Sequence, residues 1–398
     1  MDDNFRNEFE NFSEENEEDL YLSNIESFSS AVIWGTDWTV ETIVSQLEKY
    51  NIDLSPKFQR RDAWGVTEKS RLIESLILGI PIPPIILAEK DDERGKYIVI
   101  DGKQRLLTLR QFYATERDFK ELRLNNLQFL DNLNKKTRTE IKEAYGESKY
   151  LDQLDNQTIR AIVIKNWPNE EFLFTVFLRL NTGSKKLSPQ ELRQALHPGH
   201  FLDFLDEATA NSDLFHKLLN NKEADSRMRD VELALRYFAF KFNIENNKGN
   251  LKRFLDTTAS ILNTEWDARS SLIEYEFKNL EKAINICFEI FGEKSAFSRF
   301  VNSKYNNRFN RPLFEAFTYY LSNENIMSEV ELNKNDIKVK FEQASKDDLK
   351  FNDSISSTTK DLEKVEYRFS VIRNIIEDSI KSGELPKVVK DGSTLKVE

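Results

Sequence analysis

The clearest structural signal in the chain lies in residues 97–107, Tyr97-Ile98-Val99-Ile100-Asp101-Gly102-Lys103-Gln104-Arg105-Leu106-Leu107. An apolar run ends in an Asp-Gly pair, and apolar residues then recur at helical spacing. This pattern predicts a buried strand that turns directly into a helix. This turn suits the binding of a phosphate and a divalent ion. It combines a carboxylate at the strand end, a glycine that permits close backbone approach and polar side chains at a helix N-terminus. An ordinary turn with solvated charges is an equal alternative.

The composition indicates a globular protein with more than one folded unit. The chain has 398 residues, of which 39% are hydrophobic, and 29 are Phe. One core rarely organises that length. A membrane span would need about 18 consecutive apolar residues, and a signal peptide would begin with a basic region; the sequence has neither. With Cys287 as its single cysteine, it forms no internal disulfide. We therefore expect a cytoplasmic protein with no membrane partner.

The negative charge of the chain is concentrated near its beginning. The formal net charge is −11, but residues 1–30 contain ten acidic residues and one arginine, so the rest is close to neutral. We expect residues 1–28 to be a disordered acidic tail, because they contain too little apolar surface to form a core. The overall acidity therefore does not exclude a nucleic-acid partner.

Hydrophobic periodicity predicts an α+β protein. Residues 29–200 alternate strands and helices and are expected to form one domain with a small sheet and packed helices. Residues 201–380 show helical spacing and predict an all-helical domain, followed by a loose tail over residues 381–398. One helix start is unusually complete: Ser188 is placed as N-cap, Pro189 as the first helical residue and Glu191 as the capping-box acid. Strands are predicted at residues 84–89, 97–100 and 159–167.

Two further segments are candidate anion sites. Gln59-Arg60-Arg61 places two guanidinium groups where they can contact phosphate oxygens; a surface basic pair is the simpler alternative. Asn181-Thr182-Gly183 separates two predicted helices and is followed by two lysines; a capped helical corner is the simpler alternative there.

Residues 295–314 combine basic and aromatic side chains, a composition that suits phosphate neutralisation and base stacking. The alternative is a helical corner with Phe inside and Arg outside. The predicted contacts to nucleic acid are Arg299, Lys304, Arg308 and Arg311. A separate cluster around Arg227, Glu232 and Arg236 is interpreted as an internal salt-bridge network.

Familiar catalytic motifs are missing. The chain has three histidines, His197, His200 and His216, and the Pro-Gly pair between the first two disfavours a helical zinc site. There is no Walker A sequence, no dinucleotide glycine fingerprint and no Gly-x-Ser-x-Gly elbow.

Four motifs in order resemble the N-terminal domain of GmrSD-type restriction enzymes, which belongs to the ParB/sulfiredoxin-like superfamily. The resemblance covers roughly residues 38–240. The motifs are Phe58-Gln59-Arg60 with Trp64, Gly79-Ile80-Pro81-Ile82-Pro83, Ile100–Leu109, and Leu180-Asn181-Thr182-Gly183 with Leu187-Ser188 and Glu191-Leu192-Arg193.

The resemblance implies binding and hydrolysis of a nucleoside triphosphate with Mg²⁺ at the family's Asp-Gly-Gln-Gln-Arg turn. Lys103 replaces the first Gln of that motif, so phosphate binding is expected and hydrolysis is in doubt. The implied catalytic residues are Asp101, Gln104 and Arg105, with Asp101 as metal ligand. The implied nucleotide contacts are Gln59, Arg60, Arg61, Gly102, Lys103, Asn181, Thr182 and Gly183.

Many relatives carry an HNH nuclease after this domain. No histidine follows His216 here, so residues 241–398 do not contain that nuclease. We therefore expect a restriction or anti-phage component that couples nucleotide to DNA or to a separate effector protein. Two alternatives remain: a non-catalytic DNA-binding or protein-interaction module, and a metal-dependent nuclease acting through the first domain. The sequence does not specify the oligomeric state.

Overall fold

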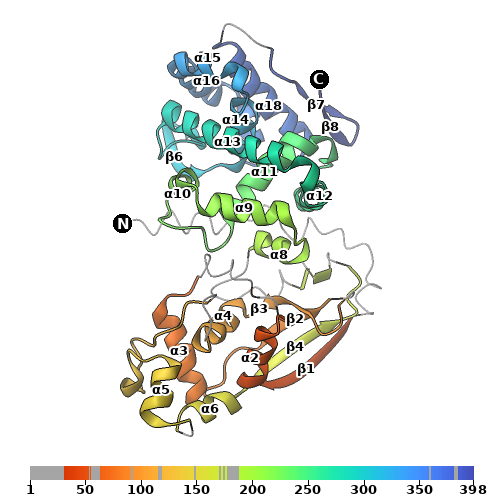
Figure 1. Ribbon diagram of the computed structural model, residues 1–398. Coiled ribbons are helices and arrows are strands. Elements are labelled where there is room, and N and C mark those ends of the chain that lie inside the picture. The colour runs from red at the N-terminus through yellow and green to blue at the C-terminus, as the bar shows by residue number, and fades with distance from the viewer. Residues whose placement is uncertain are drawn as a thin grey trace. The chain divides into compact units, whose positions relative to one another are not determined.

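The computed structural model describes residues 31–52, 54, 63–90, 93–114, 119–147, 149–169, 172–173, 175–176, 188–357, 360–380 and 384–398. The described residues divide into two compact units (Figure 1). One unit ends at Leu196 and the other runs from His197 to Glu398.

The first unit contains a four-stranded sheet in the order β1-β4-β2-β3. Its strands are β1 (Val32–Thr39), β2 (Ile85–Glu89), β3 (Tyr97–Asp101) and β4 (Thr158–Lys165). β1 pairs with β4 and β2 with β3 in antiparallel register, whereas β2 and β4 are parallel. The three predicted strands are confirmed. β1 was not predicted, because most of its residues are exposed and lack an alternating pattern.

Apolar side chains cover both faces of this sheet. Ile85 and Leu87 of β2 belong to the larger cluster, together with apolar residues of the helices that pack there. Ile86 and Ala88 face the opposite way and cluster with Leu192. Because both faces of β2 are buried, its sequence is a nearly continuous apolar run. The helices of this unit are α2 (Val40–Glu48), α3 (Val66–Ile77), α4 (Lys103–Phe112), α5 (Arg138–Tyr145), α6 (Leu151–Asn156) and α8 (Pro189–Leu196).

The second unit is mainly helical and is built around one large apolar core. Its described helices are α9 (His200–Ala210), α10 (Asp213–Leu218), α11 (Arg229–Asn243), α12 (Leu251–Thr264), α13 (Trp266–Phe291), α14 (Arg311–Leu321), α15 (Glu324–Leu332), α16 (Lys334–Asp347), α17 (Leu349–Ser354) and α18 (Leu362–Glu377). The mixed first domain followed by a helical region confirms the predicted α+β class.

Two hairpins correct the expectation of a purely helical unit with a loose tail. They pair β5 (Ser298–Val301) with β6 (Lys304–Phe309), and β7 (Val388–Asp391) with β8 (Thr394–Val397). The second hairpin is anchored because Val388 and Leu395 are buried in the core. Its turn contains Asp391-Gly392, with Gly392 at a φ of 60°, and Asp-Gly between alternating residues is a hairpin signal. The Asp-Gly pair is therefore the feature of the sequence that predicts this hairpin.

No helix among the residues described has the length and apolar character needed to cross a membrane.

Candidate functional site

The strand-to-helix turn at residues 101–103 has the predicted form. β3 ends at Asp101, and α4 begins at Lys103. Gly102 between them has a φ of 99° and a ψ of 11°, in the left-handed region that favours glycine. A Cβ atom on Gly102 would lie 2.8 Å from Cγ2 of Ile85. Both the backbone conformation and the packing therefore require glycine here.

Gly102 is also the N-cap of α4, a helix of ten residues. Because glycine has no side chain, this cap supplies no acceptor to the amides of the first helical turn. Those amides and the helix dipole favour an anion at this end of the helix.

The side chains of Asp101 and Arg105 form an ion pair across the turn. Nη2 of Arg105 donates to Oδ2 of Asp101 at 2.9 Å and to the carbonyl oxygen of Pro84 at 3.1 Å. The side chain of Arg105 is 13% exposed, whereas that of Asp101 is 42% exposed. The guanidinium thus lies against the turn, and the carboxylate remains accessible to solvent.

Lys103 has a buried partner that its sequence context does not predict. Its Nζ atom is 2.7 Å from Oε1 of Glu191, and the two side chains are 6% and 5% exposed. In the structure this ammonium points into the domain and neutralises a buried carboxylate, and its contact with phosphate stays a prediction.

Glu191 belongs to the predicted capping box, which is confirmed. Its Oε2 accepts a hydrogen bond from the backbone N–H of Ser188 at 2.8 Å, and its own N–H donates to Oγ of Ser188 at 3.1 Å. Sequence reasoning identified Glu191 as a cap but missed it as the partner of Lys103. Since these residues are 88 positions apart, no local pattern could reveal their contact.

The turn offers limited metal-binding chemistry. Within the described ranges, no group of three or more His, Cys, Asp or Glu side chains is placed to hold a metal ion. Asp101 alone fits Mg²⁺ bound jointly with a ligand, because Mg²⁺ commonly takes one or two carboxylates, substrate phosphates and several waters.

Gln104, the remaining predicted catalytic residue, is the second residue of α4 and is partly buried. The other predicted nucleotide contacts, Gln59, Arg60, Arg61, Asn181, Thr182 and Gly183, lie outside the described residues.

The basic residues predicted to contact nucleic acid differ in their exposure. Lys304 and Arg308 are exposed on β6, and Arg299 on β5 is partly buried, which lowers its pKa. Arg311 is buried at the start of α14, with its Nε 3.3 Å from Oε1 of Glu232. Residues 298–309 form a hairpin and residues 311–314 begin α14, so the segment is not the helical corner considered as its alternative.

The aromatic residues interleaved with these arginines are largely core residues. Phe297, Phe300 and Phe314 are buried in the apolar cluster of the helical unit. Base stacking therefore finds little support in this segment, and the Phe-inside arrangement considered for it is confirmed.

The salt-bridge network predicted around Arg236 is confirmed and extends further. Arg236 donates from Nε to Oε1 of Glu232 at 2.9 Å and from Nη1 to Oε1 of Glu315 at 2.7 Å. Nη2 of Arg368 lies 2.7 Å from the other carboxylate oxygen of Glu315. These contacts join α11, α14 and α18 in the interior of the unit.

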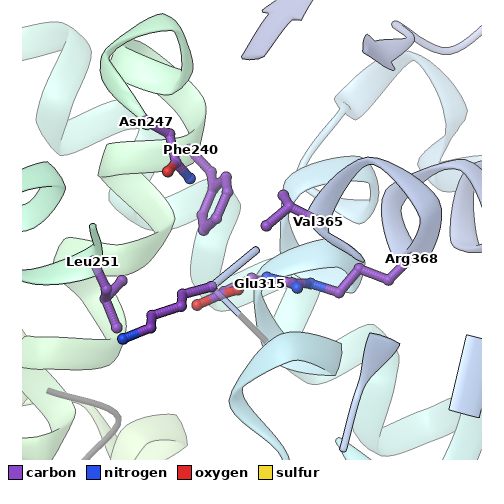
Figure 2. Close-up of a pocket in the computed structure, with 7 residues that line it drawn as sticks. Phe240, Asn247, Leu251, Glu315, Val365 and Arg368 are labelled. Atoms are coloured by element: carbon purple, nitrogen blue, oxygen red, sulfur yellow. Dashed lines mark hydrogen bonds and ion pairs between the residues drawn. The ribbon is translucent and has the colours of Figure 1, made fainter. Parts of the chain in front are cut away.

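A small pocket lies beside this network. Figure 2 shows Arg368 extending toward Glu315 at the pocket, with Phe240 and Val365 nearby. Because both oxygens of Glu315 accept from arginines, its carboxylate is committed to the network. The lining residues are Phe240, Asn247, Leu251, Glu315, Lys360, Val365 and Arg368.

Comparison with protein families finds a match within the first domain. Residues 40–198 match the family model described as "GmrSD restriction endonuclease, N-terminal domain". This segment is similar to the GmrSD N-terminal family. The match begins with the first residue of α2 and extends just beyond α8, so it contains both the Asp101–Arg105 turn and Glu191. The resemblance inferred from the motifs is confirmed, and the ParB-like affiliation stays a prediction. No curated protein and no solved structure matches the chain.

Proposed function

We propose that the GmrSD N-terminal domain of this chain binds a nucleoside triphosphate with Mg²⁺ at the Asp101–Arg105 turn. The observation that carries the proposal is the combination, within one turn, of an exposed carboxylate, a left-handed glycine cap and a guanidinium. Helix N-termini bind phosphates through their amides and dipole. A guanidinium adds directed hydrogen bonds to phosphate oxygens.

In this proposal Asp101 and Arg105 separate when the ligand binds. Asp101 would hold Mg²⁺, a cation that neutralises phosphate charge, and Arg105 would donate to a phosphate oxygen instead of to Oδ2 of Asp101. The ion pair at 2.9 Å balances both charges until then. The loss of this ion pair is compensated, because Asp101 gains Mg²⁺ and Arg105 gains a phosphate as a partner of opposite charge.

Binding of the nucleotide does not require that this domain hydrolyses it. The resemblance implies Asp101, Gln104 and Arg105 as catalytic residues, but Lys103 replaces the family's first Gln and its ammonium pairs with Glu191. Hydrolysis is therefore measured separately, as phosphate release by the wild-type protein with Mg²⁺.

The GmrSD N-terminal domain supports a role in a restriction or anti-phage system. We place the protein in the cytoplasm, where it couples nucleotide to DNA or to a separate effector protein. Lys304 and Arg308, exposed on β6, support DNA as the partner of the helical unit and favour a DNA-binding module as the second candidate function.

Calorimetric titration of the wild-type protein with ATP, GTP, CTP and UTP, each with and without Mg²⁺, tests the proposal. We expect saturable binding of at least one of them that weakens when Mg²⁺ is removed. Plasmid nicking that needs a metal but no nucleotide, and that is lost in Asp101→Ala, would instead support the nuclease alternative.

A further inference from the structure

The contact between Lys103 and Glu191 joins two distant parts of the first domain. Lys103 is the first residue of α4, immediately after Gly102, and Glu191 lies in the first turn of α8. Their charged atoms are 2.7 Å apart, and both side chains are almost fully buried. The ion pair therefore connects the beginnings of two helices, one of which carries the proposed phosphate site.

The chemistry of this pair suits a fixed support. Burial of two charges is unfavourable unless their geometry is good and further hydrogen bonds satisfy the remaining atoms. Here the second oxygen of Glu191 accepts from the N–H of Ser188 at 2.8 Å. The carboxylate thus holds the α8 cap with one oxygen and Lys103 with the other.

We propose that Lys103 is a positioning residue of the nucleotide site rather than a phosphate ligand. Its ammonium holds the capped first turn of α8 against the Asp101–Arg105 turn and so fixes the position of the α4 N-terminus. This inference rests on the proposed function, since it concerns affinity for the same nucleotide. It predicts that Glu191, which is distant in sequence from the motif, is needed for tight binding.

A move of Lys103 onto a phosphate would leave the Glu191 carboxylate buried without this cation. Such an uncompensated buried charge is strongly unfavourable. Asp101 and Arg105 lie in the same turn, and the carboxylate of Asp101 is the accessible one. In this proposal Asp101 is the metal ligand, Arg105 is the phosphate ligand and Lys103 is the positioning residue.

A double-mutant cycle distinguishes the two roles of Lys103. The variants are Lys103→Gln, which restores the usual family residue, Glu191→Gln, and both together. Gln retains capping-box geometry at the position of Glu191, so Glu191→Gln leaves the α8 cap in place. Affinity for the Mg²⁺-nucleotide that the wild type binds is measured by calorimetry on protein shown to be folded by circular dichroism.

We expect each single substitution to weaken nucleotide binding by tenfold or more. The affinity loss of the double variant should be smaller than the product of the two single losses, because both substitutions disrupt the same ion pair. A direct phosphate contact would give another pattern: Lys103→Gln alone would weaken binding, Glu191→Gln would leave it unchanged or strengthen it, and the double variant would match Lys103→Gln. Unchanged affinity in all folded variants would also overturn the proposal.

Two further variants keep the test decisive. Lys103→Arg retains the charge and should bind nearly as tightly as the wild type. If the uncharged variants do not fold, Ser188→Ala carries the test, because it removes the cap that orders the same turn of α8; unchanged affinity in folded Ser188→Ala would contradict the proposal. If the wild type binds no nucleotide, the proposed function itself fails, while denaturant unfolding of the same variants still reports the coupling of Lys103 and Glu191.

Discussion

Gly102 and Ile85 are packed so closely that a Cβ atom on Gly102 would lie 2.8 Å from Cγ2 of Ile85. Ile85 is the first residue of β2 and is buried. The neighbouring strand therefore defines the space available to the turn between β3 and α4. The turn is held by the sheet on one side and by the Arg105 contacts on the other.

Gly102→Ala should destabilise the first unit by about 2–4 kcal/mol, since it adds a steric clash to backbone strain at positive φ. Gly95→Ala is the matched control. Gly95 has a φ of 83°, but a Cβ there would meet nothing within 4 Å, so it reports strain alone, about 1 kcal/mol. Denaturant unfolding followed by circular dichroism measures both. Equal losses in the two variants would show that Ile85 does not constrain the turn.

Glu74 should make the stability of the first unit depend on pH. Burial raises the pKa of Glu74. This effect is outweighed by hydrogen bonds from the backbone N–H groups of Gln128, Phe129 and Leu130 and by the charge of Arg71. The pKa of Glu74 therefore lies below the usual 4.5. A carboxyl whose pKa is lower in the folded state stabilises the protein above the unfolded pKa, and this stabilisation is lost as pH falls through the folded pKa.

Glu74→Gln tests this role. It should reduce the free energy of unfolding at pH 7 by about 1–3 kcal/mol, and the difference from wild type should shrink as pH falls below about 4.5. Glu143→Gln, an exposed position on α5, should change little at either pH. A difference for Glu74→Gln that stays constant down to pH 3 would be incompatible with the assigned role.

Glu315 is expected to be essential for the stability of the helical unit. Its two carboxylate oxygens accept from Arg236 and Arg368 in the interior. Glu315→Gln should cost about 3–5 kcal/mol, because it leaves buried guanidinium charge uncompensated. Glu289→Gln removes the exposed pair with Lys334 and should cost less than about 1 kcal/mol. Similar unfolding midpoints for the two variants would argue against a network that joins α11, α14 and α18.

The exposed basic residues of β6 give a prediction for DNA. If the helical unit binds DNA through Lys304 and Arg308, replacing both by Ala should reduce the slope of log K against log salt by about 2. Arg253→Ala with Lys278→Ala, exposed positions on α12 and α13, should leave the slope unchanged. Fluorescence anisotropy at several salt concentrations measures both pairs, and equal slopes would remove β6 from the interface.

The sequence predicted the local features of the first domain well. The turn at Gly102 and the capping box at Ser188 and Glu191 arise from residues within a few positions of each other, where conformational preference and capping chemistry act directly. The partners of charged side chains were harder to predict. The contact of Lys103 with Glu191 and the burial of Arg311 depend on tertiary packing, which neither charge nor spacing along the chain reveals.

The hairpins show a different limit. Residues 295–314 interleave aromatic and basic residues, a pattern that we interpreted with helical spacing. In the structure β5 pairs with β6, and side chains along paired strands alternate between the two faces with a period of two residues. Their turn places Asn302 and Ser303 at positive φ, as in the tight turns that connect paired strands. Ser is a less explicit turn signal than Gly, so this hairpin was hard to recognise.

The most direct test of the central claim is calorimetric titration of the wild type and Arg105→Ala with Mg²⁺ and the four nucleoside triphosphates. Arg123→Ala, in which an exposed arginine paired with Glu140 is removed, is the matched control. We predict that the wild type and Arg123→Ala bind the same nucleotide equally and that folded Arg105→Ala binds it at least tenfold more weakly. Absence of binding to the wild type, or equal binding by all three proteins, would contradict the assignment of the Asp101–Arg105 turn as a nucleotide site.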